Sequence, residues 1–378
     1  MNKIMAFGSL ALVALAGCSQ DNNVTGPAAD RAVQIEERGA AVSEDAPGAV
    51  YALTNAAGGN AVAVFSRASD GSLMWQRSVA TGGSGAGGGL GSQGAIALSD
   101  DGHWLFAVNA GSNDVSVFHV KGDKLSLSSR VASGGIRPIS LTVNDDVVYV
   151  LNAGGDGNIS GFKVDARGAL RSIAGSTRPL SGTAVGPAQV SFSPNGRWLV
   201  VTEKTTNRLD VYPVDDRGRA SAPITHASAG GTPFGFAFGR RDELFVSEAA
   251  GSASSYEVER DGSLTVTSGA VATHQGAPCW AVVTKNGKFG YTANAQGGSI
   301  SGFAIDNDGS ISLIDADGRT AVVGGGNIDL ALNRNSRFLY QLNGNRSISG
   351  FRVEADGHLT AVGNVAGLPA SSVGLVAR

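Results

Sequence analysis

The chain has 378 residues, of which 55 are glycine, 16% are charged and 6% are aromatic. Its 29 basic and 32 acidic residues give a formal charge of −3 with no long run of either sign, which argues against a nucleic-acid-binding protein. Short apolar runs separated by glycine-rich turns are typical of an all-β chain, and a repeat array can reach this length without dividing into several domains.

The first 17 residues predict a lipoprotein signal peptide. Lys3 precedes an apolar stretch, residues 4–16, that is too short to span a bilayer but has the length of a signal-peptide core. Residues 15–18 read LAGC and resemble the bacterial lipobox, in which the cysteine, here Cys18, is lipidated and becomes the mature N-terminus. Ser19 follows where Asp is the usual inner-membrane signal, and this favours an outer-membrane lipoprotein that faces the periplasm. The alternative is an ordinary cleaved signal with a chance cysteine.

Residues 18–48 predict a flexible tether. They are rich in Asp, Asn, Ala, Gly and Glu and show no sustained periodicity, so we expect them to hold the folded part, residues 49–378, off the membrane. The lipid membrane, reached through Cys18, is therefore the first expected partner. After processing, Cys279 is the one remaining free thiol, which excludes an intramolecular disulfide.

A short apolar strand that ends in Asn or Glu recurs seven times after the tether. From Asn55 to Asn343 the copies span 288 residues in six intervals, a mean period of 48 residues that fits a four-stranded propeller blade. The copies are residues 51–55, 105–109, 148–152, 199–203, 244–248, 290–294 and 339–343. A second, alternating strand follows each copy and then a tight turn such as Asp70-Gly71, because Asp-Gly tolerates positive φ.

These repeats predict an all-β fold, a seven-bladed β-propeller of four-stranded blades. Inner strands precede six of the copies, at residues 95–99, 139–143, 189–193, 234–238, 280–284 and 328–332. The first copy has none, because the tether leads straight into residues 51–55. We expect the C-terminal strand, residues 373–377, to complete the first blade, which closes the ring and hides a strand edge.

The strand order assigns the loops to two faces of the propeller. Hairpin turns lie on one face, and the loops that enter the inner strands lie on the other, around the tunnel mouth where propellers usually bind ligands. The longest of these entering loops, residues 82–94, is rich in glycine and is interpreted as either a mobile flap or slack.

Residues 50–378 resemble the lactonase-type β-propellers, the family of 6-phosphogluconolactonase and 3-carboxymuconate cyclase. The resemblance rests on the strand YALTN at residues 51–55 and its copies, which are similar to the YVTN repeat. Residues 202–204 and 275–280 are similar to an envelope branch of the family. For an enzyme, the resemblance implies a His, an Arg and a Glu around the tunnel mouth.

The chain departs from the family pattern at these positions. The run expected to carry the Arg and a His reads GPAQ at residues 186–189, and Arg137 enters the neighbouring blade where another His is expected. Glu203 is the acid that remains. Lactone opening needs a base that activates water and a positive group that faces the oxyanion, so Glu203 and Arg137 are the catalytic candidates, without an evident base partner.

The predicted ligand-binding residues lie around the tunnel mouth. Glu203 and Glu248 replace Asn at the repeated strand end, with Lys204 as a local partner, and the alternative is that this position caps the following turn. His274 and Cys279 offer a Cys–His nucleophile pair, and the alternative is that Cys279 is a small buried residue. Trp280 either lines the tunnel or packs between blades. The full set is Arg137, Gln189, Glu203, Glu248, Cys279, Trp280 and Asn327.

Two functions from different classes follow. The first is a monomeric cell-envelope lipoprotein that binds a small polar ligand or an envelope protein at the loop-rich face, without efficient turnover. The second is a lactone hydrolase or cyclase with a rearranged active site; a cytosolic sugar-phosphate role fits export poorly, because that substrate is made inside the cell. No cofactor or metal is expected, since the histidines lack metal-ligand spacing and the sequence contains no P-loop or dinucleotide fingerprint.

Overall fold

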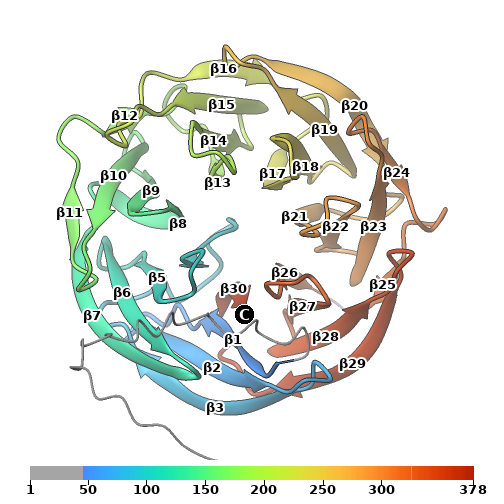
Figure 1. The fold of residues 1–378 in the computed structure, drawn as a ribbon, viewed down its shortest axis with the longest axis horizontal. Coiled ribbons are helices and arrows are strands. Elements are labelled where there is room, and N and C mark those ends of the chain that lie inside the picture. The colour runs from blue at the N-terminus through green and yellow to red at the C-terminus, as the bar shows by residue number, and fades with distance from the viewer. Residues whose placement is uncertain (1–45, 325) are drawn as a thin grey trace, which may run out of the picture. The chain divides into compact units, whose positions relative to one another are not determined.

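The computed structural model describes residues 46–324 and 326–378. The predicted signal peptide, Cys18 and all but the last residues of the predicted tether lie outside these described residues. Seven antiparallel sheets surround a central axis as blades (Figure 1), which confirms the predicted seven-bladed β-propeller. In this part of the chain no helix is long and apolar enough to cross a membrane.

Each blade begins with a short inner strand that faces the tunnel and continues with a second strand. From blade 1 to blade 7, the inner strands are β30 (Val373–Ala377), β4 (Ile96–Leu98), β8 (Ile136–Asn144), β13 (Pro187–Phe192), β17 (Pro233–Phe238), β21 (Pro278–Val283) and β26 (Asn327–Leu332). The second strands are β1 (Gly48–Leu53), β5 (Trp104–Asn109), β9 (Val147–Gly154), β14 (Trp198–Glu203), β18 (Glu243–Glu248), β22 (Phe289–Asn294) and β27 (Phe338–Asn343).

The third and outer strands complete the blades. The third strands are β2 (Ala61–Arg67), β6 (Asp114–Lys121), β10 (Asn158–Val164), β15 (Arg208–Pro213), β19 (Ser252–Val258), β23 (Ser299–Ile305) and β28 (Ser347–Val353). Five outer strands are continuous, namely β3 (Leu73–Ala80), β7 (Lys124–Ala132), β16 (Ile224–Ala227), β20 (Leu264–Ala272) and β29 (Leu359–Ala366). In blades 3 and 6 the outer edge is split into two short strands, β11 (Leu170–Ser172) with β12 (Arg178–Pro179), and β24 (Ile311–Leu313) with β25 (Ala321–Val322).

The two ends of the described chain meet in blade 1. β30 pairs antiparallel with β1, with Val376 opposite Tyr51 and Leu375 opposite Ala52. The guanidinium of Arg67, on β2, donates through Nε to the backbone oxygen of Arg378 at 3.1 Å. The predicted ring closure is therefore confirmed, and the C-terminal strand covers what would otherwise be an open edge.

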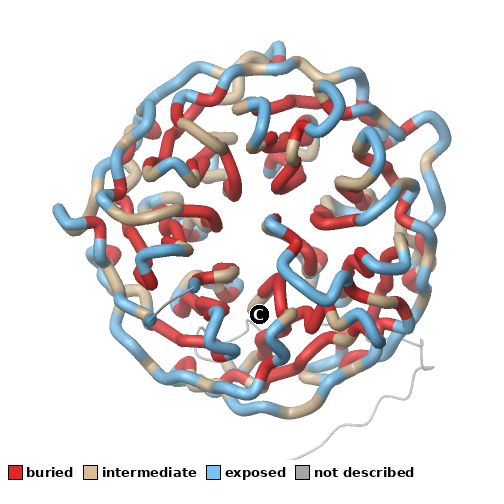
Figure 2. Tube along the Cα trace, turned by 180° about the vertical axis from the view of Figure 1, so that it is seen from behind, coloured by how far each residue is buried: buried red, intermediate tan, exposed pale blue. Residues whose placement is uncertain are grey.

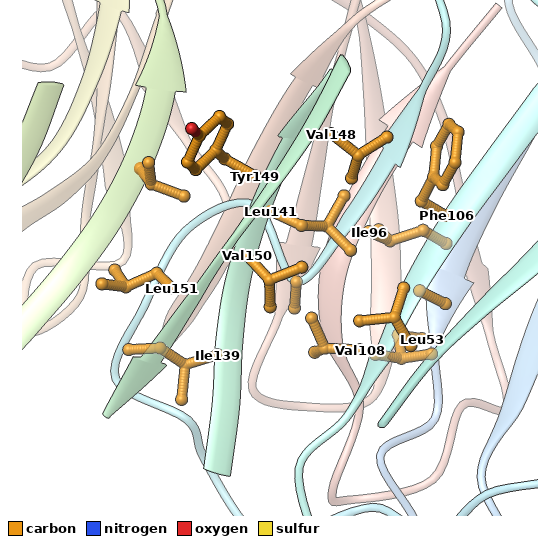
Figure 3. Close-up of a cluster of buried hydrophobic side chains, with 14 of the residues drawn as sticks. Leu53, Ile96, Phe106, Val108, Ile139, Leu141, Val148, Tyr149, Val150 and Leu151 are labelled. Carbon is orange, nitrogen blue, oxygen red and sulfur yellow. The ribbon is translucent and has the colours of Figure 1, made fainter. Parts of the chain in front are cut away.

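Burial follows the distance of a strand from the tunnel axis. Buried residues fill the inner and middle strands, and the outer strands and loops carry most of the exposed ones (Figure 2). The largest apolar cluster joins side chains of blades 1 to 4, among them Leu53, Val108 and Leu141 (Figure 3). Since each fully buried aliphatic side chain contributes about 1.5–3 kcal/mol, contacts between neighbouring blades stabilise the ring.

The repeated Asn at the strand end joins the second strand to the third strand of the same blade. Asn294 donates through Nδ2 to the hydroxyls of Ser299 at 3.0 Å and Ser301 at 2.9 Å. Asn343 bonds two serines of blade 7 in the same way. In blades 6 and 7 the partners are therefore side-chain hydroxyls, whereas Asn55 in blade 1 accepts from a backbone N–H group, that of Ala86.

Candidate functional site

The glycine-rich residues 82–94 leave β3 and reach toward the centre of the ring before β4 begins (Figure 1). Asn55 holds their first half, because its Nδ2 donates to Gly88 O at 2.6 Å and its Oδ1 accepts from Ala86 N at 2.8 Å. Blades 3, 4 and 6 bind the second half. The interpretation as a flap or slack is therefore wrong, and we call residues 82–94 the plug.

Gln93 binds the plug to the inner strands of blades 4 and 6. Its Nε2 donates to Ala281 O at 2.7 Å, and its Oε1 accepts from Ala281 N at 2.9 Å. Its own N–H donates to Ala188 O at 3.1 Å. Gly235 makes room for this side chain, since a Cβ at Gly235 would lie 2.1 Å from Gln93 Oε1.

Trp280 holds the plug from blade 6. Its indole Nε1 donates to Ser92 O at 3.0 Å, and the Ser92 hydroxyl donates in turn to Ile139 O at 2.8 Å. The indole also makes an edge contact with the ring of Phe234, with the ring centroids 5.3 Å apart. This predicted ligand-binding residue is mostly buried and contacts the plug.

A cavity of about 280 Å³ lies beside the plug, between the loops that enter blades 3 and 4. Its charged lining residues are Arg137, Asp156 and Lys204. Its apolar lining comes from Leu90, Ile139, Leu180, Val185 and Pro187. We call it the Arg137–Lys204 cavity. A lining with two cations and one acid has the chemistry that suits an anionic group together with neutral polar groups.

Lys204 follows the end of β14 directly and lies between the cavity and the plug. Its Nζ donates to Pro187 O at 3.1 Å and to Gly91 O, and lies 4.9 Å from the centroid of the Phe234 ring. Burial lowers the pKa of Lys204 to about 8; the Cys279 thiol opposes this shift, and the nearby positive charge of Arg137 adds to it. The two cations are therefore close enough to repel each other.

Arg137 lies at the rim of the cavity and is exposed. Its backbone adopts a positive φ of 56° just before Pro138, and its N–H donates to Asn113 Oδ1 at 2.7 Å. This hydrogen bond fixes an uncommon backbone conformation for a residue with a side chain. The start of β8 thus places a guanidinium group at the tunnel mouth.

Glu203 and Glu248 do not line this cavity. Both carboxylates are 0% exposed and are bound within the protein. Glu203 accepts hydrogen bonds from the N–H and the hydroxyl of Ser181, at 3.0 and 2.5 Å, and from the hydroxyl of Thr206 at 2.6 Å. Glu248 accepts from Gly230 N at 2.7 Å and from hydroxyls of its own blade. Both acids are thus buried and occupied by donors of the protein itself.

Gln189 and Asn327 also have partners inside the ring. The Gln189 amide bridges two inner strands, because Nε2 donates to Phe236 O at 3.0 Å and Oε1 accepts from Phe236 N at 2.8 Å. Asn327 Nδ2 donates to Ser299 O at 2.7 Å, and the side chain is buried. Of the predicted set, the cavity lining therefore includes Arg137 and none of the others.

Cys279 is buried next to Lys204. Burial raises the pKa of its thiol to about 12, and the charge of Lys204 offsets only part of this shift. His274 is exposed, and no hydrogen bond of the described chain joins it to Cys279. The thiol is therefore protonated near neutral pH, which speaks against the Cys–His nucleophile pair.

On the opposite face, the tunnel forms a second cavity of about 720 Å³. Gln93 lines it together with Thr142, Ser191 and Phe238. The plug thus reaches this wider space through Gln93. In the described residues, no group of three or more His, Cys, Asp or Glu side chains could hold a metal ion.

Seven blades in a closed ring define a seven-bladed β-propeller, and the Arg137–Lys204 cavity lies at its tunnel mouth. Residues 58–184 and 240–319, more than half of the chain, match the family model described as "Lactonase, 7-bladed beta-propeller". The chain belongs to this lactonase family. A search of curated proteins returned no match.

Solved structures share this fold at low sequence identity. A Bacteroides fragilis protein, named as a candidate 6-phosphogluconolactonase, is 18% identical with a TM-score of 0.71, over 89% of this chain and 99% of that one. A Lactobacillus plantarum protein is 19% identical with a TM-score of 0.71, over 88% and 100%. The periplasmic gluconolactonase of Pseudomonas aeruginosa is 18% identical with a TM-score of 0.70, over 87% and 99%.

Lys204, Asp156 and the plug were not part of the predicted ligand-binding set. Lys204 has a local signal, because it directly follows the repeated strand end and this places it on the tunnel-mouth face. Asp156 lies in the loop after β9, which shares that face. The course of the plug depends on contacts with blades 4 and 6 that are distant in sequence, and no local pattern reports them.

Proposed function

We propose that this lactonase-family propeller binds a small polyhydroxy carboxylate in the Arg137–Lys204 cavity and does not open lactones efficiently. The proposal rests on the pairing of two cations at one cavity, close enough for Arg137 to lower the pKa of Lys204. A carboxylate bound between them relieves their repulsion and forms charge-assisted hydrogen bonds.

The polar groups around the cations suit the rest of such a ligand. Asp156 at the rim accepts hydrogen bonds from hydroxyl groups, and apolar side chains such as Leu90 and Ile139 contact the carbon chain. Two proteins of the same fold are named for gluconolactone substrates. Hydrolysis of such lactones yields polyhydroxy carboxylates, and this chemistry guides the choice of ligand.

The cavity lacks the positioned base that efficient turnover of a lactone would need. The Glu203 carboxylate is occupied by Ser181 and Thr206, and the Cys279 thiol is held in its protonated form. The described lining of the cavity contains no imidazole. Loss of a general base typically costs about 10²–10⁴ in rate.

One observation favours the alternative, a lactone hydrolase with a rearranged site. Because the pKa of Lys204 is lowered to about 8, a part of this amine is neutral at physiological pH. A neutral Lys204 would take a proton from water as the water attacks the acyl carbon, while Arg137 faces the developing oxyanion. Lys204 is, however, already bound to two backbone oxygens.

Calorimetric titration tests the binding proposal. We expect D-gluconate to bind, and D-glucitol, which has the same carbon chain without the carboxylate, to bind at least tenfold more weakly. Arg137→Gln should cost about tenfold or more, because hydrogen bonds to charged groups contribute about 1.5–3 kcal/mol. Arg346→Gln, which removes an exposed cation from blade 7, is the matched control. Equal binding of gluconate and glucitol contradicts the proposal.

Hydrolysis of D-glucono-1,5-lactone, followed by titration of the released acid, separates the two functions. Rates at the uncatalysed background support a binding protein. Rates well above background that fall in both Lys204→Met and Lys204→Arg would establish the hydrolase. The two variants are used together because Lys204→Arg retains the cation that holds the plug.

We also propose that the protein is anchored in the bacterial envelope through a lipid on Cys18. The support is the lipobox-like sequence at residues 15–18, and one protein of the same fold is named as periplasmic. Cys18→Ala should abolish incorporation of labelled palmitate and leave an unprocessed precursor. A Cys18→Ala protein that is processed and fractionates like the wild type would refute the anchor.

A further inference from the structure

Blade 4 contains an acid at a position where five other blades have serine. The residue lies on the third strand, opposite the position two residues before the repeated strand end. In blades 2, 3, 5, 6 and 7 it is Ser116, Ser160, Ser254, Ser301 and Ser349. In blade 4 it is Asp210, opposite Val201 on β14. Since the strand end of blade 4 is Glu203, two acids meet there.

Both acids are 0% exposed. Asp210 Oδ1 accepts from the hydroxyl of Thr225 at 2.7 Å, and Asp210 Oδ2 is buried without a partner. Glu203 is the titratable group that raises the pKa of Asp210, and both acids in turn raise the pKa of Tyr212, which lies on the same strand as Asp210. Neither acid forms an ion pair with a described cation, and Arg208, opposite Glu203, is exposed.

Two buried carboxyl groups in contact cannot both ionise without strong repulsion. Burial raises the pKa of Asp210 to about 7, and the neighbouring Glu203 adds to this shift, while the Thr225 hydroxyl opposes it. Below this pH Asp210 is protonated and uncharged. Above it, the second charge has no cation to compensate it.

Glu203 connects this pair to the wall of the Arg137–Lys204 cavity. It holds both the N–H and the hydroxyl of Ser181. The cavity is lined by Leu180, which precedes Ser181 directly, and by residues 184–187, which follow it a few positions later. Glu203 also holds Thr206, in the turn that begins with Lys204.

We propose that Glu203 and Asp210 are positioning residues for this cavity, and that a proton on Asp210 keeps the wall at residues 180–187 in place for the ligand. The inference rests on the proposed function only for the identity of the ligand. When the proton leaves, repulsion from Asp210 displaces the Glu203 carboxylate from Ser181, the wall loosens, and ligand affinity falls. Blade 5 also has a strand-end acid, Glu248, but the residue beside it is Ser254 instead of a second acid. The Ser254 hydroxyl donates to the Glu248 carboxylate at 2.6 Å, so the carboxylate meets a donor and no repulsion.

Gluconate titrations of the full-length protein between pH 5.5 and 9 test the ligand side. We expect the gluconate affinity of the wild type to fall about tenfold as the pH rises through 7. A change of this size corresponds to a difference of one unit in a pKa between the free and the bound protein. Asp210→Asn mimics the protonated acid and should remove this step, leaving only the separate decline around pH 8 that comes from Lys204. Asp210→Ser, the residue of five other blades, should remove it as well and guards against a folding defect of the first variant. A step around pH 7 that persists in both variants would overturn the proposal.

Ser254→Asp is the matched control, since it places a second acid beside Glu248 in blade 5, away from the cavity. We expect it to lower the melting temperature above neutral pH and to leave gluconate affinity unchanged. A loss of affinity equal to that of the wild-type step would show that the effect reflects general loosening of the ring, and would overturn a positioning role for Glu203 and Asp210.

Hydrogen exchange gives a reading that needs no ligand. Corrected for the intrinsic pH dependence of exchange, protection of residues 180–187 should fall in the wild type between pH 6 and 8 and stay constant in Asp210→Asn. If gluconate binds at no pH while this change in protection occurs, the proposed function fails and the positioning pair stands. Constant protection in the wild type overturns the positioning pair, whatever the outcome of the titrations.

Discussion

The side-chain amide of Gln93 makes both hydrogen bonds of a strand pair with the backbone of Ala281, which lies 188 residues further along the chain. Between blades 4 and 5 the same arrangement uses Gln189 of the inner strand, which bonds the N–H and the oxygen of Phe236. The inner strand of blade 5 has Gly235 at this position, without a side chain. The plug supplies the missing amide, and this makes it part of the ring.

Gly235→Ala tests this relationship. The added methyl group would lie 2.1 Å from Gln93 Oε1 and 2.7 Å from Cys279 O, so that either the Gln93 amide or the backbone must move. We expect the free energy of unfolding to fall by about 1–3 kcal/mol, the usual cost of overpacking, in urea unfolding. Gly88→Ala is the control within the plug, because its new methyl group meets no atom within 4 Å. Equal stability of the two variants would contradict a structural role of the plug.

Deleting residues 370–378 removes β30 and opens blade 1. Leu375 is 5% exposed and packs in the apolar cluster between blades 7 and 1, and β30 pairs with β1. We expect aggregation or a large, cooperative drop in melting temperature, because the edge of β1 becomes exposed and the packing of β30 against β26 is lost. Arg378→Ala is the control, since the contacts of Arg378 with Arg67 and Ala49 use its backbone. An unchanged melting curve after the deletion would show that closure is dispensable.

The fold could be predicted from the sequence because each blade repeats one local pattern. Alternation, Asp-Gly turns and the strand-end Asn recur with a nearly constant period, and every copy predicts the same four strands. Even the closure by β30 follows from this pattern, since one repeat lacks an inner strand at its start and one strand remains at the C-terminus.

The candidate site could be predicted only in part, because it depends on contacts between distant segments. Arg137 is recognisable from its place in an entering loop. Glu203, however, stands at a tunnel-facing position in the repeat, and only the structure shows that Ser181 and Asp210 surround it. The position of Lys204 against Gly91 depends in the same way on a plug whose course is set by blades 4 and 6.

Asp329 should make stability depend on pH. It is 2% exposed on the inner strand of blade 7, and burial raises its pKa well above the ordinary value, despite hydrogen bonds from Leu330 and Leu375 N–H. The folded protein then keeps this proton at pH values where the unfolded chain, with a pKa of about 3.9, has released it. Stability from this group is therefore full below about pH 4 and is lost as the pH rises toward the folded pKa.

Asp329→Asn should remove this dependence, because Asn, like the protonated acid, offers one acceptor oxygen and a donor. We expect the variant to match the wild type at pH 4 and to melt at a higher temperature at pH 7.5, measured by calorimetry. Asp261→Asn, at an exposed turn, is the control for the loss of one carboxyl group. A lower melting temperature of Asp329→Asn at pH 7.5 would show that the charged form is favoured in the fold.

Lys204 should make ligand binding fall at alkaline pH. Its pKa is lowered to about 8 by burial, so the amine loses its positive charge as the pH rises from 7 to 9, while a carboxylate ligand stays ionised. The effect is best measured in the Asp210→Asn background, where residue 210 does not titrate. There, gluconate affinity should fall by about tenfold across this range, since one of two cations at the cavity is neutralised. Lys204→Arg keeps its charge at all these pH values and should hold the affinity constant. A decline of equal size in Lys204→Arg would place the titrating group elsewhere and would remove Lys204 from the binding site.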